Sequence, residues 1–124
     1  MNVTGWIPDM AWDATISLGA ATTTCVATIQ LKDFAGNALT TKNAINIFVT
    51  TDAAGDETEA VTSVVLATHG IIHTIQDTYA YQLITEDNGI AAVTIDGTGD
   101  VDNYLNVVLP NGKIVTSAKI DFTG

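Results

Sequence analysis

Two histidines, three serines and one cysteine are the residues of this 124-residue chain that could support catalysis. His69 and His73 share one face if their segment is a strand, but no third metal ligand stands near them in the sequence. No serine lies in a Gly-x-Ser-x-Gly elbow. Cys25 lies within an alternating apolar run, where a thiol is expected to be a small buried hydrophobe. We therefore predict no catalytic residue and no enzymatic activity.

Carboxylates gather in two short segments, residues 52–59 and residues 96–102. The second segment alternates oxygen-bearing side chains, as a calcium loop does. Val101 and Val107, however, occupy the positions at which an EF-hand needs glycine and glutamate. We interpret both segments as solvated acidic turns and keep a bound cation as the alternative. No resident metal and no cofactor are predicted.

The first twelve residues differ from the rest because they hold both tryptophans and show no strict alternation. Tryptophan is enriched at protein interfaces because it buries a large area with few rotamers to immobilise. We predict that residues 1–12 form an irregular arm whose partner-binding residues are Trp6, Ile7, Met10 and Trp12. The alternative is that the two tryptophans fold back and close one end of the domain.

From Asp13 onward the chain reads as short strands separated by turn signals, at the spacing of a β-sandwich. The expected strands are residues 14–20, 22–31, 45–51, 61–67, 71–75, 79–85, 90–95, 103–109 and 113–122. The turns between them carry residues that tolerate positive φ, such as Asn88-Gly89. We predict an all-β, immunoglobulin-like (Ig-like) antiparallel sandwich of seven to nine strands over residues 13–124.

Alternation within these segments predicts which side chains enter the core. The residues expected to share buried faces are Cys25, Ala27, Ile29 and Leu31; Ile45, Ile47 and Val49; Ala91, Val93 and Ile95; and Ile114, Ala118, Ile120 and Phe122.

The formal net charge is −10, with four lysines and no arginine. Binding to nucleic acid or to an anionic membrane needs clustered cations, so we expect neither partner. The first residues lack the basic and apolar regions of a signal peptide, and no run is long enough for a membrane helix. We therefore expect synthesis in a cytoplasm without secretory export.

Three segments resemble the invasin/intimin type of bacterial Ig-like domain. They are TIQLKDFAGNAL at residues 28–39, ITEDNGIAAVTI at residues 84–95 and NYLNVV at residues 103–108. Residues 49–56 and 104–115 are similar to small stand-alone phage virion proteins of this fold. The resemblance covers roughly residues 22–122, and the arm has no counterpart in it.

The resemblance implies a structural virion protein, most simply a capsid decoration (cement) protein on the outer surface of the head. The major capsid protein would be its partner, and the bacterial host cytoplasm its place of synthesis. Such proteins form symmetric clusters, so a homo-oligomer is expected, with a trimer suggested by head-lattice symmetry. The alternative is a glycan- or host-surface-binding accessory module of a phage tail or head fibre.

Overall fold

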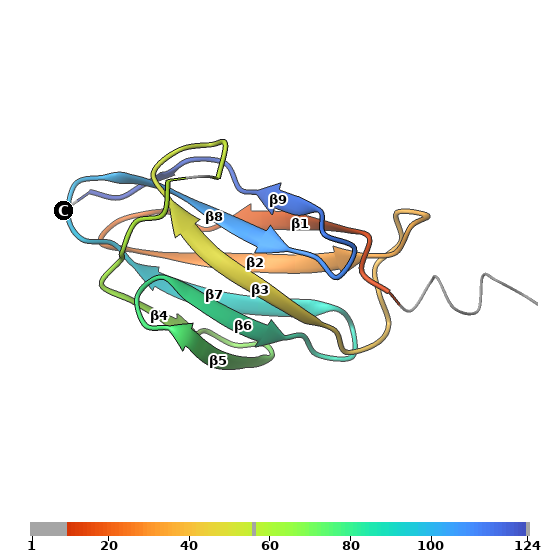
Figure 1. Ribbon diagram of the computed structural model, residues 1–124. Coiled ribbons are helices and arrows are strands. Elements are labelled where there is room, and N and C mark those ends of the chain that lie inside the picture. The colour runs from red at the N-terminus through yellow and green to blue at the C-terminus, as the bar shows by residue number, and fades with distance from the viewer. Residues whose placement is uncertain (1–9, 56, 124) are drawn as a thin grey trace, which may run out of the picture.

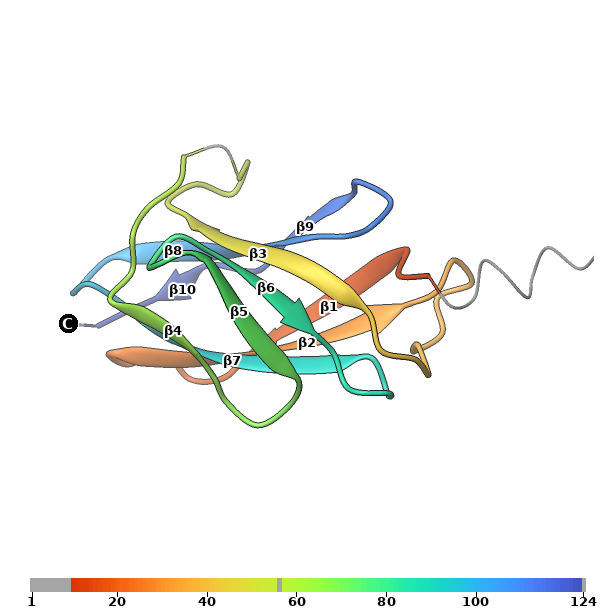
Figure 2. The ribbon, with the colours of Figure 1, turned by 60° about the horizontal axis from the view of Figure 1, so that its bottom comes forward.

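The computed structural model describes residues 10–55 and 57–123, which form two packed antiparallel sheets (Figures 1 and 2). The strands are β1 (Asp13–Leu18), β2 (Thr24–Lys32), β3 (Ala44–Thr50), β4 (Ser63–Leu66), β5 (Ile71–Gln76), β6 (Ala80–Ile84), β7 (Ile90–Asp96), β8 (Asp102–Val108), β9 (Ile114–Thr116) and β10 (Ile120–Asp121). The all-β sandwich is confirmed, with ten strands in the described residues where seven to nine were predicted. None of the described residues belongs to a helix that could cross a membrane.

The order of strands is β1-β2-β7-β4 in one sheet and β10-β8-β3-β6-β5 in the other, where β9 also pairs with β8. In Ig-like domains the second strand pairs with the fifth, and the third with the sixth, at the centres of the two sheets. The central pairs here are β2 with β7 and β3 with β8. They match that arrangement when the β5–β6 hairpin is left out of the count. The β5–β6 hairpin extends the β3 sheet on the side away from β8.

The core lies between the two sheets and follows the predicted alternation in three of the four segments. In β2, β3 and β7 every residue expected to face inward is buried. Cys25 is one of them: its Sγ lies 3.5 Å from the Gly19 carbonyl oxygen, and burial raises the pKa of the thiol. The prediction of a small buried hydrophobe at this position is confirmed.

The prediction of one continuous strand over residues 113–122 is wrong. The chain breaks between β9 and β10 at Ser117, whose Oγ accepts the Leu105 N–H (3.0 Å) while its own N–H bonds the Leu105 carbonyl (2.8 Å). The register against β8 moves by one residue across this break. Ile114 and Ala118 are therefore exposed, whereas Ile120 and Phe122 enter the core as expected.

The acidic loop after β3, described at residues 52–55 and 57–58, lies against the outer face of the β3 sheet, where the polar residues Thr50 and Asn106 are buried. Asn106 Nδ2 donates to Thr50 Oγ1 (2.9 Å), and Asn106 Oδ1 accepts from Thr116 Oγ1 (2.7 Å). A Cβ at Gly55 would lie 2.8 Å from Asn106 Oδ1, so the close approach requires glycine. Alternation placed Thr50 on the solvent side, and the loop covers it.

Candidate partner-binding surface

Two of the four predicted partner-binding residues, Met10 and Trp12, are described by the structure, and both are exposed. Trp6 and Ile7 lie outside the described residues, so their part in the prediction stays untested. Between the two exposed residues, Ala11 is fully buried in the core cluster. The chain is thus already anchored to the sandwich before β1 begins.

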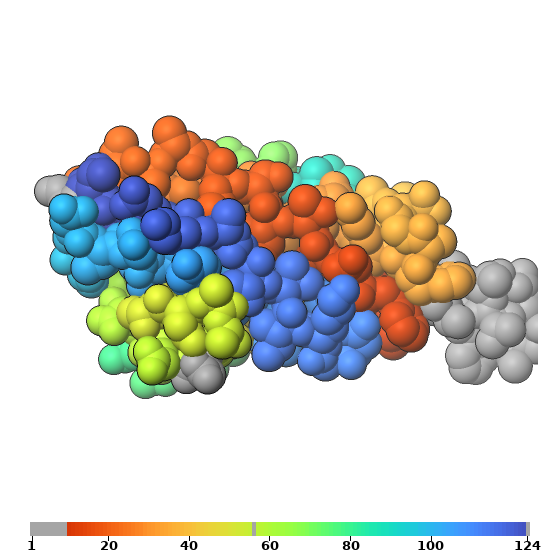
Figure 3. Space-filling model, turned by 90° about the horizontal axis from the view of Figure 1, so that it is seen from above, coloured from red at the N-terminus to blue at the C-terminus, as the bar shows by residue number. Residues whose placement is uncertain are grey.

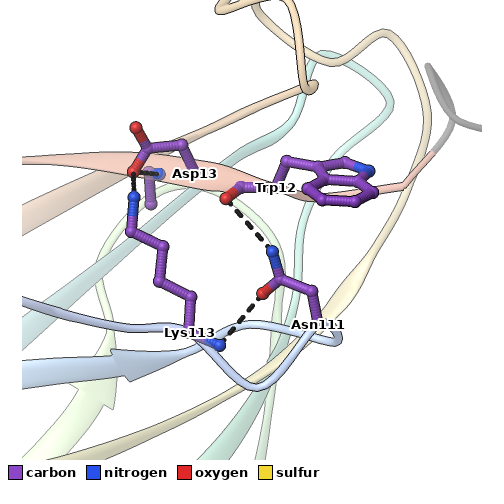
Figure 4. Close-up of polar contacts among 5 residues, drawn as sticks. Trp12, Asp13, Asn111 and Lys113 are labelled. Atoms are coloured by element: carbon purple, nitrogen blue, oxygen red, sulfur yellow. Dashed lines mark hydrogen bonds and ion pairs between the residues drawn. The ribbon is translucent and has the colours of Figure 1, made fainter.

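The backbone of Trp12 is held on both sides, and Figure 4 shows the contact with Asn111. The Trp12 N–H donates to the Lys32 carbonyl of β2 (2.9 Å), and the Trp12 carbonyl accepts from Asn111 Nδ2 (3.3 Å). Asn111 Oδ1 in turn accepts the Lys113 N–H (3.0 Å). Seen from above, the β1 segment lies directly beside the β8–β9 hairpin (Figure 3). The backbone of Trp12 is therefore held by two chain segments that are distant from each other in the sequence.

Phe34 completes an exposed aromatic pair that the sequence analysis missed. Its ring meets the Trp12 ring edge to face, with centroids 6.4 Å apart and an interplanar angle of 65°. The turn that carries it is rigid, because Asp33 Oδ1 accepts the N–H groups of Ala35 (2.9 Å) and Asn37 (3.0 Å). Trp12 is 38% exposed and Phe34 is 49% exposed. We call Met10, Trp12 and Phe34 the aromatic patch.

Charge is distributed unequally between the two ends of the sandwich. The end away from the aromatic patch, here the acidic end, holds eight described carboxylates: Asp52, Glu57, Glu59, Asp77, Asp96, Asp100, Asp102 and Asp121. Its one described lysine is Lys119, 3.7 Å from Asp102. The aromatic-patch end balances Asp13, Asp33, Glu86 and Asp87 against Lys32, Lys42 and Lys113. The aromatic patch therefore lies at the nearly neutral end of a strongly acidic protein.

Asp13 fastens β1 to the neighbouring hairpin. Its Oδ1 accepts the Ala14 N–H (2.8 Å) and the Lys113 ammonium (3.1 Å), and these two contacts, in that order, hold the pKa of Asp13 below its ordinary value of 3.8. Because the folded pKa is the lower one, the carboxylate stabilises the fold fully above pH 3.8. That contribution is lost as the pH falls through the folded pKa. Both side chains are about half exposed, so the ion pair itself contributes little.

Replacing Lys113 with methionine is expected to raise the pKa of Asp13 only part of the way to its ordinary value, because the larger contribution from the Ala14 N–H remains. An NMR pH titration of the Asp13 carboxyl carbon measures this. Lys42→Met removes the same charge from a lysine that makes no contact with Asp13. Equal shifts in the two variants would show that net charge, and not the contact, lowers the pKa.

The histidines and acidic segments singled out in the sequence do not converge. His69 lies in the turn before β5, and its Nδ1 is 2.5 Å from Glu86 Oε1. His73 lies within β5 itself. Asp52 Oδ1 accepts the Glu57 N–H (3.1 Å), which orders the acidic loop internally. Among the described residues, no three His, Cys, Asp or Glu side chains gather around one point, and no cavity opens.

Neither a protein-family model nor a curated protein sequence matches this chain.

Proposed function

We propose that this chain is a structural virion protein, a capsid decoration protein that binds the outer surface of a phage head through its aromatic-patch end. The observation that carries the proposal is the aromatic patch itself. The Trp12 backbone is hydrogen-bonded, the Trp12 and Phe34 rings contact each other, and both residues are still substantially exposed to solvent. A pre-ordered aromatic anchor loses little entropy on binding, which is the property of an interface hot spot.

The charge distribution supports attachment by this end. A partner that docks at the aromatic patch meets a nearly neutral surface, while the acidic end points away from it. Packaged DNA is polyanionic and repels the acidic end, which favours the outside of a shell over its interior. The major capsid protein is the partner proposed for this contact.

The candidate surface is an exposed patch, and no cavity opens in the described part of the chain. Enzymes and small-molecule receptors hold their ligands in clefts lined by converging polar groups. The aromatic patch instead combines exposed rings with neighbouring strand ends and turns. Such a surface suits a broad protein partner.

The test is binding of the purified protein to heads of the encoding phage that lack it. Trp12→Ser is expected to weaken binding by about 30-fold, the ratio that corresponds to a 2 kcal/mol hot spot. Phe34→Ser is expected to have a similar effect, because it removes the ring that supports Trp12. Val65→Ser is the matched control, since Val65 is a similarly exposed apolar residue on β4, at the opposite edge of the same sheet from β1.

Deletion of residues 1–9 measures the contribution of Trp6 and Ile7. Removing residues 1–12 would also remove Ala11 from the core, so the shorter deletion is the cleaner one. Wild-type binding by both the deletion and Trp12→Ser would contradict attachment through this end. Saturable binding to a cell-surface glycan, together with no binding to heads, would favour the accessory-module alternative.

A further inference from the structure

The free edge of β5 is an exposed row of backbone groups with no protecting side chain. β5 ends its sheet and pairs only with β6 (Figure 2). Its sequence, Ile-Ile-His-Thr-Ile-Gln, has no charged residue and no proline, the devices that usually keep an edge strand from pairing. Ile71 is 51% exposed and Ile75 is 60% exposed. Apolar side chains thus lie at both ends of an unguarded strand.

Hydrogen-bond alternation identifies the backbone groups that face outward. The Thr85 N–H donates to the Asn43 carbonyl (2.9 Å), directly continuing the β3–β6 ladder. Alternate residues of β6 therefore bond β3, and those between them bond β5 through Ile71 and His73. The N–H and C=O groups of Ile72 and Thr74 consequently point away from the sheet.

The other sheet edges in the described part of the chain are short or blocked. β4, β9 and β10 have four, three and two residues. β1 is as long as β5, but the Asp13 carboxylate already occupies the outward N–H of Ala14, and Lys113 covers that carboxylate. β5 is therefore the one long edge in the described residues with no side chain bonded to its outward groups.

We propose that a second copy of this chain adds to the free edge of β5 in antiparallel orientation, strand to strand. A two-fold axis at His73 brings Ile72 of each copy opposite Thr74 of the other, so the outward groups satisfy one another reciprocally. The register irregularity after Thr74 limits the regular pairing to the first part of the strand and leaves Ile75 beside Ile71 of the second copy. The result is one continuous sheet running through both copies.

The strand is complementary to itself, because one two-fold axis pairs both of its outward residues with those of an identical strand, and its lack of charge permits a second copy as the occupant. Two chains of net charge −10 repel each other over most of their surfaces, and β5 is a segment on which they can approach without meeting a carboxylate. Antiparallel pairing also separates the two Asp77 residues that follow β5. Each Asp77 approaches the opposite end of the partner strand, where the turn carries His69 in contact with Glu86.

The association goes beyond the proposed function and does not depend on it, because it is measured in solution without heads. Analytical ultracentrifugation over a concentration series is expected to show a weak monomer–dimer equilibrium. Thr74→Pro removes an outward N–H but no bond to β6, and it is expected to weaken dimerisation at least about tenfold. His73→Lys places two ammonium groups face to face at the axis and should weaken it similarly. Thr15→Lys, on the exposed face of β1, adds the same charge away from the two-fold axis and should leave dimerisation unchanged.

A cysteine cross-link provides a positive signal. Opposed residues of a non-hydrogen-bonded antiparallel pair have Cα atoms close enough for a disulfide, so His73→Cys should form a covalent dimer on mild oxidation. Thr15→Cys is the control, and the buried Cys25 does not compete. Monomer alone at concentrations up to about 1 mM, with no faster cross-linking than the control, would overturn the proposal. A dimer insensitive to both Thr74→Pro and His73→Lys would overturn it as well.

Discussion

Replacing Phe122 with alanine is expected to lower the free energy of unfolding by about 3–5 kcal/mol. Phe122 is fully buried at the acidic end, where its N–H donates to the Val101 carbonyl (3.1 Å). The truncation removes a large apolar side chain and leaves a cavity that the strand ends around it can only partly fill. A domain of this size has about 5–15 kcal/mol of stability in all, so the loss is a large fraction of it.

Urea unfolding followed by circular dichroism measures this loss, with the slope against denaturant expected to stay unchanged. Phe34→Ala is the matched control, because it makes the same chemical change at a half-exposed position in a turn. It should cost less than about 1 kcal/mol. A similar loss at both positions would mean that Phe122 is not the core residue described here.

The neighbour of Phe122 allows a sharper test. A Cβ added at Gly97 would lie 2.6 Å from the nearest atom of the Phe122 ring, so Gly97→Ala is expected to destabilise the wild-type protein. In the Phe122→Ala background the added methyl group enters the space left by the ring and should cost little. The two effects are therefore expected to be non-additive, by about 1–3 kcal/mol. Simple additivity would show that the two residues do not contact each other.

Local alternation made most of the core predictable from the sequence. In β2, the buried residues Cys25, Ala27, Ile29 and Leu31 follow a strict period of two, which depends only on the chain itself. The break between β9 and β10 was less predictable, because the residue that causes it contacts a residue distant in the sequence. Ser117 bonds Leu105, twelve residues away, and nothing in the sequence around Ser117 signals that contact.

The candidate surface shows the same division between local and long-range causes. The rigid turn after Asp33 has a local signature, since Asp33, Gly36 and Asn37 are turn residues. That this turn brings Phe34 against Trp12 depends on the pairing of β1 with β2. The sequence did carry one signal for Phe34: it is an aromatic residue within a turn segment of a chain that has few aromatic residues. That signal would have added Phe34 to the predicted partner-binding residues.

The two-fold symmetry proposed for the dimer depends on strand order, which the sequence does not reveal. Only the completed sheet shows that β5 lies at an edge. An isologous β5 contact joins two copies and is then used up, so it cannot by itself build the trimer suggested by head-lattice symmetry. A cluster of three copies would need a second contact between copies. The aromatic patch is proposed to bind the head instead. Pairing through β5 and attachment through the aromatic patch use different parts of the molecule and can coexist.

Replacing Gly70 with alanine is expected to cost about 2–4 kcal/mol of stability. Gly70 has a φ of +96°, which an L-residue adopts only with strain. A Cβ there would also lie 2.6 Å from the Ile84 carbonyl oxygen, a backbone atom that cannot rotate away. The two costs add because the chain cannot relieve the contact without moving β5 along β6.

Gly112→Ala is the control that separates the two costs. Gly112 also has a positive φ, +86°, but nothing lies within 4 Å of the position its Cβ would take. It should lose only about 1–2 kcal/mol, the cost of the left-handed backbone alone. Equal losses in the two variants would show that the contact with Ile84 is not significant.

The Gly70 variant also connects stability to assembly. Ile71 follows Gly70 directly and sets the register of β5 against Ile84. A shift that relieves the new Cβ contact therefore moves the outward groups of Ile72 and Thr74 as well. The folded fraction of Gly70→Ala is expected to dimerise more weakly than wild type, whereas Gly112→Ala, in the hairpin beyond β8, should dimerise normally. Normal dimerisation by both variants would mean that the position of β5 tolerates the substitution.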